Sequence, residues 1–334
     1  MRIAFFDTQS FERPVFEATN AGHGHTITFF DTSLNASSAA LARGHDAVCV
    51  FVNDRADAAA IGEFRELGVK VIATRSAGFN HIDLAAAAAA GIAVVRVPEY
   101  SPHAVAEHAM CLILALNRKI HRAYVRVREL NFSLDGLMGF DLFGATVGVI
   151  GTGRIGRAMI QILSGFGSKI LVYDPQPDEG LVARFGVQYV ELSELYAASD
   201  VITLHCPLLP QTHHLINAEA LSQMNREVIL INTGRGALID TKALIAALKA
   251  GRVGGAGLDV YEEEEGVFFH DLSKGTLQDD VLARLLTFSN VLITSHQGFL
   301  TREALRNIAS TTLANFSAFE RGEKLVNEVR PSGS

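Results

Sequence analysis

The chain has 334 residues, of which 49% are hydrophobic and 19% are charged. This composition predicts a folded protein with room for two domains of ordinary size, and it argues against a disordered chain. The formal net charge of −7 argues against nucleic acid as a partner, because phosphate backbones favour basic surfaces.

The first hundred residues alternate short apolar runs with helix-like stretches. This alternation is typical of a parallel sheet with helices on its faces, and the stretch carries no glycine-rich nucleotide motif. The expected strands are 2–6, 26–30, 47–52 and 69–73, and the expected helices are 37–42, 56–67 and 82–90.

One long apolar helix is expected next, from Ser101 to about Arg128. Ser101 suits the N-cap and Pro102 suits the first helical position. Its apolar surface leaves two alternatives open. The helix is buried within the monomer, or it forms the contact surface of a homo-oligomer, a dimer or a tetramer.

Residues 146–174 combine a buried strand, a glycine turn, a helix, a second strand and an acid, in that order. Gly151, Gly153 and Gly156 have the G-x-G-x-x-G spacing, which lets a pyrophosphate approach the N-terminus of the following helix. Asp174 closes the second strand, where a carboxylate can accept hydrogen bonds from a ribose. No arginine follows it, so the motif predicts NAD rather than NADP.

Strands and helices alternate again after this motif. We therefore expect two parallel α/β domains, one of residues 1–100 with 297–334 and a nucleotide-binding one of residues 101–296. The expected strands are 201–204, 228–231, 254–258 and 291–293, and the expected helices are 193–198, 217–224, 240–250, 279–286 and 301–320.

Three polar side chains follow directly after expected strands of the second domain. Arg235 lies between two glycines, and its planar fork suits a carboxylate and an adjacent carbonyl. His296 suits proton exchange with an alcohol or a carbonyl. Asp259 ends a third strand, and glutamates at 262–265 follow it. Such a run is usually a solvated loop, although one member can face inward.

The other histidines and the cysteines indicate no further site. His103 and His108 have no partners at a metal-ligand spacing, and the adjacent His213 and His214 should project apart, so we expect no metal. The three cysteines form no C-x-x-C pair, which favours a reducing cytoplasm. No signal peptide or membrane-spanning segment is expected, because the apolar runs are too short.

The motifs together resemble the D-2-hydroxyacid dehydrogenase family. They are GTGRIG (151–156), HCPL (205–208), NTGRGALID (232–240), LDVYEEE (258–264) and TSHQGF (294–299). Other segments resemble those members that interconvert pyruvate and D-lactate: VFVND (50–54), RSAGFNHID (75–83), VPEYSPHAVAEHA (97–109), LNRKIHRAY (116–124) and NFSLDGLMGFDLFG (131–144). The resemblance implies a Rossmann NAD domain inserted in a flavodoxin-like substrate domain.

The resemblance also assigns roles to residues. It implies that Arg235, Glu264 and His296 are catalytic, and it thereby selects Glu264 from the four glutamates. It implies cofactor contacts at Gly151, Gly153, Arg154, Ile155, Gly156, Asp174, Cys206, Pro207, Thr233, Gly234 and Asp259. It implies substrate contacts at Ala77, Gly78, Tyr100, Arg235 and Phe299.

Two positions depart from the family pattern. Phe51 stands where some members have tyrosine, so a hydroxyl contact is missing there, and Gly234 stands where many members have serine. The implied reaction is the NADH-dependent reduction of pyruvate to D-lactate, with Arg235 on the substrate and His296 and Glu264 as the acid/base pair. Two alternatives stay open. One is a family member for another 2-oxo acid, such as glyoxylate, hydroxypyruvate or a branched-chain acid, and the other is an NAD(H)-sensing interaction protein.

Overall fold

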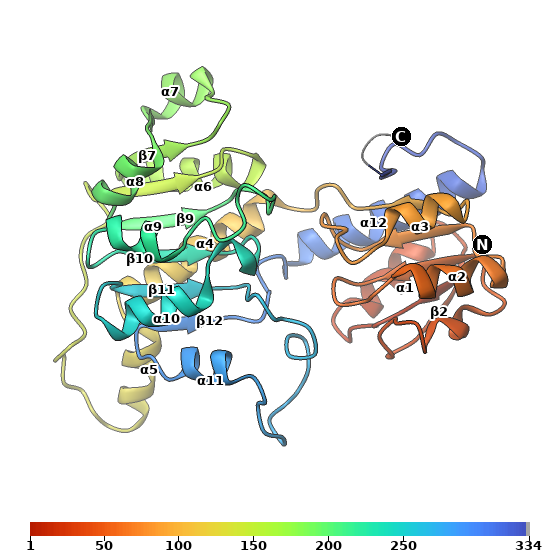
Figure 1. Ribbon diagram of the computed structural model, residues 1–334, viewed down its shortest axis with the longest axis horizontal. Helices are drawn as coiled ribbons and strands as arrows, with labels where there is room; N and C mark the ends of the chain where they lie inside the picture. The colour runs from red at the N-terminus through yellow and green to blue at the C-terminus, as the bar shows by residue number, and fades with distance from the viewer. Residues whose placement is uncertain (332–334) are drawn as a thin grey trace. The chain divides into compact units, whose positions relative to one another are not determined.

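The computed structural model describes residues 1–331, which form two compact units (Figure 1). Unit 1 comprises Met1–Ser101 and the segment that starts at Phe299, and unit 2 comprises Pro102–Gly298. The chain therefore leaves unit 1 after Ser101 and returns to it after Gly298.

Unit 1 is built on a five-stranded parallel sheet with the order β2-β1-β3-β4-β5. This is the flavodoxin-like order. Its strands are β1 (Arg2–Phe5), β2 (Thr26–Phe29), β3 (Ala47–Val50), β4 (Val71–Thr74) and β5 (Ala93–Val95). Its helices are α1 (Arg13–Asn20), the short 3-10 helix η1 (Ala39–Ala42), α2 (Ala58–Leu67), α3 (Leu84–Ala89) and α12 (Arg302–Glu320).

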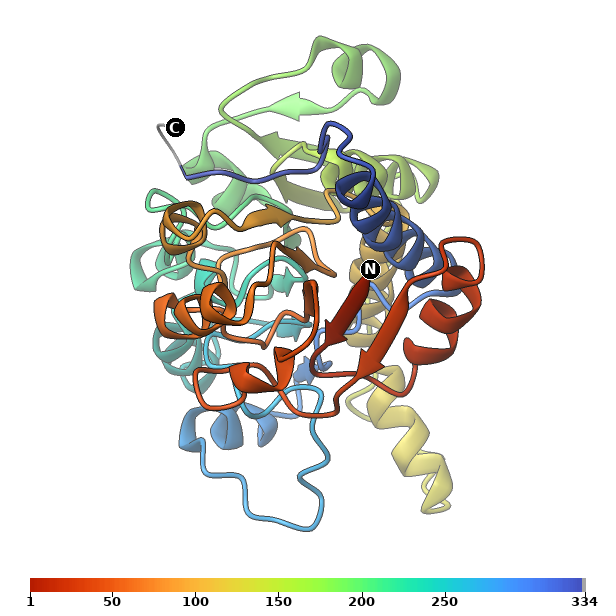
Figure 2. The same cartoon turned by 90° about the vertical axis from the view of Figure 1, so that its right-hand side faces the viewer.

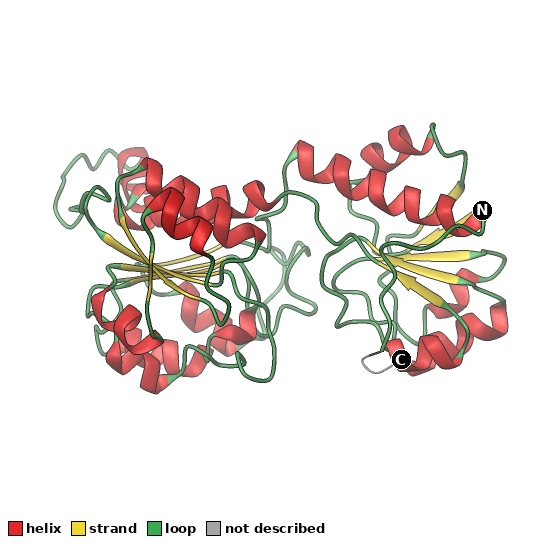
Figure 3. Ribbon diagram, turned by 90° about the horizontal axis from the view of Figure 1, so that it is seen from above, coloured by secondary structure: helices red, strands yellow, loops and turns green. Residues whose placement is uncertain are grey.

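Helices cover both faces of this sheet (Figure 3). Successive residues of a strand point to opposite faces, so the side chains of β1 pack in two hydrophobic cores, one on each face of the sheet. Ile3 packs in the core that includes Phe316 of α12, whereas Ala4 packs in the core that includes Phe64 of α2. On the first of these faces α12 lies beside α1 (Figure 2). The last helix of the chain thus completes the core of the unit that the first strand begins.

Unit 2 is built on a seven-stranded parallel sheet with the order β12-β11-β10-β9-β6-β7-β8. Its strands are β6 (Thr146–Ile150), β7 (Lys169–Tyr173), β8 (Gln188–Tyr189), β9 (Val201–Leu204), β10 (Ile229–Asn232), β11 (Gly255–Leu258) and β12 (Val291–Ile293). Its helices are α4 (Pro102–Asn117), α5 (Ile120–Arg128), α6 (Arg154–Gly165), α7 (Glu179–Phe185), α8 (Leu192–Ala198), α9 (Ala218–Gln223), the 3-10 helix η2 (Gly236–Leu238), α10 (Thr241–Lys249) and α11 (Asp280–Leu286).

The strand order of unit 2 reverses between β6 and β9. From β6 the chain moves outward through β7 and β8, and it then returns to β9 and continues in the other direction to β12. In open α/β sheets, ligands bind outside the carboxyl ends of the strands at this reversal. One face of the sheet packs on α4 and α6, and the other packs on α8 to α11. The expected class, two doubly wound parallel sheets, is confirmed.

Several expected elements differ in the structure. The single helix expected over 101–128 is wrong, because Lys119 adopts a φ of 52° and divides it into α4 and α5. The sequence analysis missed β5 and β8, which have only three and two residues, and it also missed α1 and α7. Within residues 1–331, no helix has both the length and the hydropathy needed to cross a bilayer.

Candidate active site

The glycine turn follows β6 at the point where the strand order reverses. Gly151 has a φ of 98°, and a Cβ there would lie 2.7 Å from the backbone nitrogen of Cys206. A Cβ on Gly156 would collide with the carbonyl oxygen of Gly151. Gly153 caps α6 with open space around its missing Cβ, so a ligand can approach the free N–H groups of the helix. The turn fits a phosphate group.

Asp174 lies beside this turn, one residue past the end of β7. Its Oδ2 accepts hydrogen bonds from the N–H (2.7 Å) and the hydroxyl (2.9 Å) of Thr152, and its Oδ1 accepts one from the N–H of Gln176 (2.9 Å). Partial burial raises the pKa of Asp174, but these N–H donors outweigh burial and hold the pKa below its ordinary value. The carboxylate is therefore ionised and attached to the glycine turn.

The turn after β10 offers a buried hydroxyl. The side chain of Asn232 holds this turn, because its amide nitrogen donates to the carbonyl of Arg235 (2.8 Å) and its oxygen accepts from the N–H of Gly234 (3.0 Å). The hydroxyl of Thr233 is buried and has no hydrogen-bond partner among residues 1–331. A buried polar atom of this kind usually has a partner, so the turn fits a polar ligand.

The remaining expected cofactor residues lie on the same strand ends. Arg154 and Ile155 form the first turn of α6, and Cys206 and Pro207 follow β9 next to Gly151. Burial raises the pKa of the Cys206 thiol to about 11, so the thiol is neutral. The glycine turn, the ionised Asp174 and the Thr233 hydroxyl together fit a dinucleotide such as NAD.

Arg235 follows β10 on a turn that packs against the chain after β11. A Cβ on Gly236 would collide with the backbone of Tyr261, so glycine is needed for this approach. The guanidinium donates one hydrogen bond, to the carbonyl of Gly234 (2.7 Å), and no other within residues 1–331. The side chain is partly exposed, so its other donors are available to a ligand.

The side chains of Glu264 and His296 meet. Oε2 of Glu264 lies 2.8 Å from Nδ1 of His296, and Oε1 accepts the N–H of Tyr261 (2.9 Å). A carboxylate only accepts hydrogen bonds, so Nδ1 carries a hydrogen and Nε2 is left for another partner. Such a pair can deliver a proton from Nε2.

The run of four glutamates is divided between two partners and solvent. Glu264 pairs with His296, and Glu262 pairs with His214 at 2.7 Å, while the other two are exposed. The expectation that His213 and His214 project apart is wrong: their rings stack with centroids 4.0 Å apart. The cause is the backbone of His214, which adopts a φ of 51°.

The loop that carries His296 is attached to Asp259. The carbonyl of Asp259 accepts the N–H of His296 (2.7 Å), and its carboxylate, 1% exposed, also contacts His108 at 3.2 Å. Burial raises the pKa of Asp259, but hydrogen bonds from His108 and Thr294 outweigh it and hold the pKa below its ordinary value. Sequence analysis missed His108, because its partner lies about 150 residues away in the chain and nothing in the spacing indicates the contact.

Four of the five expected substrate residues, all except Arg235, lie in unit 1. After β4, the carbonyl oxygen of Ala77 accepts a hydrogen bond from Arg96 (2.8 Å) and that of Gly78 accepts one from Ser76 (2.7 Å). Within residues 1–331 the N–H groups of Ala77 and Gly78 donate to nothing. Two neighbouring free N–H groups suit an anion such as a carboxylate.

Aromatic rings gather around Phe299 in the same unit. Its ring centroid lies 6.2 Å from that of Phe11, 6.3 Å from that of Tyr100 and 6.5 Å from that of Phe51. The guanidinium of Arg75 lies over the Phe51 ring at 4.9 Å. Sequence analysis missed Phe11, which precedes α1 and belongs to no expected element. This cluster presents an apolar surface.

Comparison with known proteins identifies the family of this chain. Residues 110–298 match the family described as D-isomer specific 2-hydroxyacid dehydrogenase, NAD binding domain. The chain is 50% identical over 329 residues to a D-lactate dehydrogenase of Escherichia coli strain K12, covering 98% of this chain and 100% of that protein.

Solved structures are also similar. The pyruvate reductase of Chlamydomonas reinhardtii matches with a TM-score of 0.93 and 45% identity over 98% of each chain. An NAD-complexed D-isomer specific 2-hydroxyacid dehydrogenase from Lactobacillus delbrueckii ssp. bulgaricus matches with a TM-score of 0.81 and 30% identity over 99% of this chain and 100% of that one. The chain therefore belongs to the D-isomer specific 2-hydroxyacid dehydrogenase family and is an NAD-dependent oxidoreductase.

Proposed function

We propose that the protein reduces pyruvate to D-lactate, reversibly and with NADH. The observation that carries the proposal is the pair formed by Glu264 and His296, 2.8 Å apart in the segments that follow β11 and β12. Arg235 follows β10, the strand next to β11. The similarity to a D-lactate dehydrogenase and to a pyruvate reductase supports pyruvate as the substrate.

Each residue of the catalytic set has a distinct task in this proposal. The guanidinium of Arg235 binds the 2-oxo acid and polarises its carbonyl, since a planar fork can contact two oxygens. His296 delivers a proton from Nε2 to the carbonyl oxygen, and Glu264 holds Nδ1 and fixes the orientation of the ring. NADH, when bound, supplies the hydride.

The substrate contacts follow from unit 1. The free N–H groups of Ala77 and Gly78 bind the carboxylate of the acid. The rings of Tyr100 and Phe299 pack edge to face within the aromatic cluster. In this proposal the two rings line the pocket for the side chain of the acid. An apolar lining of this kind accepts a methyl group.

The NAD contacts follow from unit 2. The glycine turn takes the pyrophosphate and Asp174 takes the adenosine ribose. The proposed contacts are Gly151, Gly153, Arg154, Ile155, Gly156, Asp174, Cys206, Pro207, Thr233, Gly234 and Asp259.

The test is NADH oxidation with pyruvate, glyoxylate, hydroxypyruvate, 2-oxoisocaproate and phenylpyruvate in parallel, with NADPH as the cofactor control. We expect the highest kcat/KM for pyruvate with NADH, and D-lactate in a stereospecific product assay. A higher value for a larger acid would keep the mechanism and change the substrate. NADH binding without turnover of any acid would instead support a sensing protein that recruits a partner.

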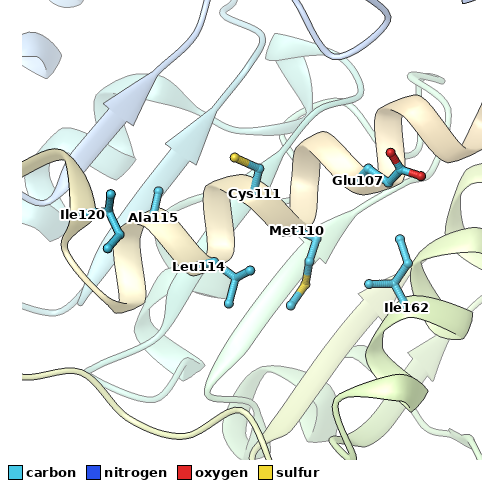
Figure 4. Close-up of a pocket in the computed structure, with 7 residues that line it drawn as sticks. All are labelled: Glu107, Met110, Cys111, Leu114, Ala115, Ile120 and Ile162. Carbon is cyan, nitrogen blue, oxygen red and sulfur yellow. The ribbon is translucent and has the colours of Figure 1, made fainter. Parts of the chain in front are cut away.

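We also propose that the protein is a homo-oligomer. An apolar groove of about 410 Å³ lies along α4, lined by Met110, Leu114, Ile120 and Ile162 among others (Figure 4). No residue of α5 is buried. The segment that follows is also apolar and exposed, at Leu130, Phe132, Leu134, Met138 and Phe143. An apolar surface of this extent is typical of a contact with a second copy.

Sedimentation velocity tests the oligomer. We expect wild type to sediment as a dimer or tetramer at micromolar concentration, and the double variant Leu134→Glu, Met138→Glu to sediment as a smaller species. A double variant at the exposed polar positions Lys70→Glu and Lys324→Glu controls for added charge. A monomeric wild type would reject the proposal.

The cysteines favour the cytoplasm as the location. All three are free thiols, and Cys111 is exposed, as is common in a reducing compartment. Microscopy of a fluorescent fusion tests this, and a secreted fusion would contradict it.

A further inference from the structure

The carboxylate of Asp259 holds the loop that carries His296. Its Oδ1 accepts the hydroxyl of Thr294 (2.6 Å) and the N–H of Gln297 (2.8 Å), and its Oδ2 accepts the N–H of Gly298 (2.8 Å). The acceptor is nearly inaccessible to water, at 1% exposure. The residues on both sides of His296 are thus attached to one buried side chain.

His108 supplies a donor to this carboxylate from a different element. Its Nε2 lies 3.2 Å from Oδ1 of Asp259 and 3.0 Å from Oγ1 of Thr294. The carboxylate only accepts, and the Thr294 hydroxyl already donates to it, so Nε2 must carry the hydrogen. The ring also packs on Gly298, where an added Cβ would lie 3.5 Å from Cδ2 of His108.

The loop needs such an attachment. His296 has a φ of 49°, a left-handed conformation that is unfavourable for a residue with a Cβ. Strained backbone persists where surrounding contacts over-determine it. The contacts that hold His296 come from Asp259 and Glu264, and both acceptors follow β11. His108 ties this arrangement to α4, a helix with nine of its 16 residues buried.

We propose that His108 is a positioning residue: by donating to Asp259 it fixes the loop 294–298 on α4 and so holds His296 in its working orientation. The inference rests on the proposed role of His296 as the proton donor. It concerns orientation, so it predicts a loss of turnover with little loss of cofactor affinity.

Two substitutions at His108 separate donation from packing. His108→Leu removes the N–H and fills the space of the ring with an apolar side chain. His108→Gln keeps an N–H at a similar reach. His103→Leu is the matched control, because His103 lies on the same helix and is exposed. The measurements are kcat for pyruvate, the Kd for NADH from fluorescence, the melting temperature, and amide hydrogen exchange of residues 294–298.

For His108→Leu we expect kcat to fall about tenfold and exchange at Gln297 and Gly298 to accelerate about tenfold, with the Kd for NADH within about twofold of wild type. His108→Gln should restore both within about threefold, and His103→Leu should match wild type. If His108→Leu keeps wild-type kcat and exchange and changes only the melting temperature, the ring merely fills space and the proposal is wrong.

Failure of the proposed function gives a different result. If wild type turns over no 2-oxo acid, the role of His296 fails, and hydrogen exchange then decides whether His108 holds the loop. If wild type turns over pyruvate and His108→Leu is as active as His108→Gln, the proposed function stands and only the positioning role of His108 is wrong.

Discussion

Glu264 contacts two groups with its two oxygens, the N–H of Tyr261 and the imidazole of His296. The first contact fixes the carboxylate, and the carboxylate then fixes the ring. With Nδ1 held on the carboxylate, Nε2 is the ring nitrogen left for another partner. In the proposed reaction, Glu264 therefore orients the ring that delivers the proton.

Glu264→Gln removes the charge and keeps the size of the side chain. We expect kcat/KM for pyruvate to fall at least about tenfold, because a neutral amide holds the N–H of Nδ1 less firmly than a carboxylate does and the ring loses its fixed orientation. The measurement is kcat/KM for pyruvate. Glu263→Gln is the matched control, since Glu263 is the exposed neighbour. An unchanged kcat/KM in Glu264→Gln would show that the pair does not orient the ring for catalysis.

His205 makes stability depend on pH. Burial lowers the pKa of His205 to about 4, whereas an unfolded histidine titrates near about 6.5. Between these values the unfolded chain binds a proton that the folded chain does not, so the free energy of unfolding falls as the pH drops. We expect a loss of about 2 kcal/mol from this group between about pH 7 and pH 5.

Urea unfolding of wild type and His205→Gln at these two pH values checks this expectation. Other groups titrate in both proteins, so the difference between the two isolates His205. The variant should lose less stability on acidification than wild type does. Equal losses would mean that His205 titrates normally in the folded chain.

Only part of the site is readable from the sequence. Strand ends alone indicated Arg235 and His296, because carboxyl ends of parallel strands are where ligands bind. Glu264 needed the family resemblance, since four consecutive glutamates look alike until the fold turns two of them toward histidines. His108 and Phe11 were missed, because both act through contacts that the chain makes at long range.

At the scale of elements, the position of α6 depends on its contact with the glycine turn. Gly151 and Gly156 are in contact, so the first turn of the helix sits directly on the end of β6. That contact aims the helix N-terminus outward. Any side chain at Gly156 would therefore displace the free N–H groups at the start of α6, to which the proposed function assigns the pyrophosphate.

Gly156→Ala tests the close contact between Gly151 and Gly156. We expect the Kd for NADH to rise at least about tenfold, because the added methyl meets the carbonyl of Gly151 and the turn must move. Gly165→Ala is the matched control, since it adds the same methyl to α6 at a position with nothing within 4 Å. The measurement is fluorescence titration with NADH. Unchanged affinity in Gly156→Ala would contradict the close contact.

Elements with strong periodicity were predictable, and short ones were not. The strands with the glycine turn and the acid were placed by local pattern, as were most helices after them. β5 and β8 are too short to show a period, and the break between α4 and α5 lies at Lys119, a residue type that gives no sign of a left-handed backbone.

At the scale of the whole molecule, each unit has a core of its own. The core residues of unit 2 all lie within 102–298, and those of unit 1 lie outside that range. A core that draws on one continuous stretch of chain can form without the rest.

A fragment of residues 102–298 should therefore fold cooperatively and bind NADH within about tenfold of the affinity of the whole chain. It should reduce no 2-oxo acid, because Ala77, Gly78 and Tyr100 are absent. Urea unfolding, NADH titration and an activity assay check these three expectations. A fragment that fails to unfold cooperatively would mean that unit 2 depends on unit 1.

The position of α12 has a consequence for the order in which the two units can fold during synthesis on the ribosome. One face of the unit 1 sheet, with Ile3, Phe5 and Val95, is covered by α12, whose residues 302–320 are translated about 200 residues after β5. The unit that is synthesised first is thus completed last, the reverse of the usual order for multidomain chains. Until α12 has been translated, α1 is the helix that covers this apolar face, and an apolar face exposed in this way is prone to aggregation.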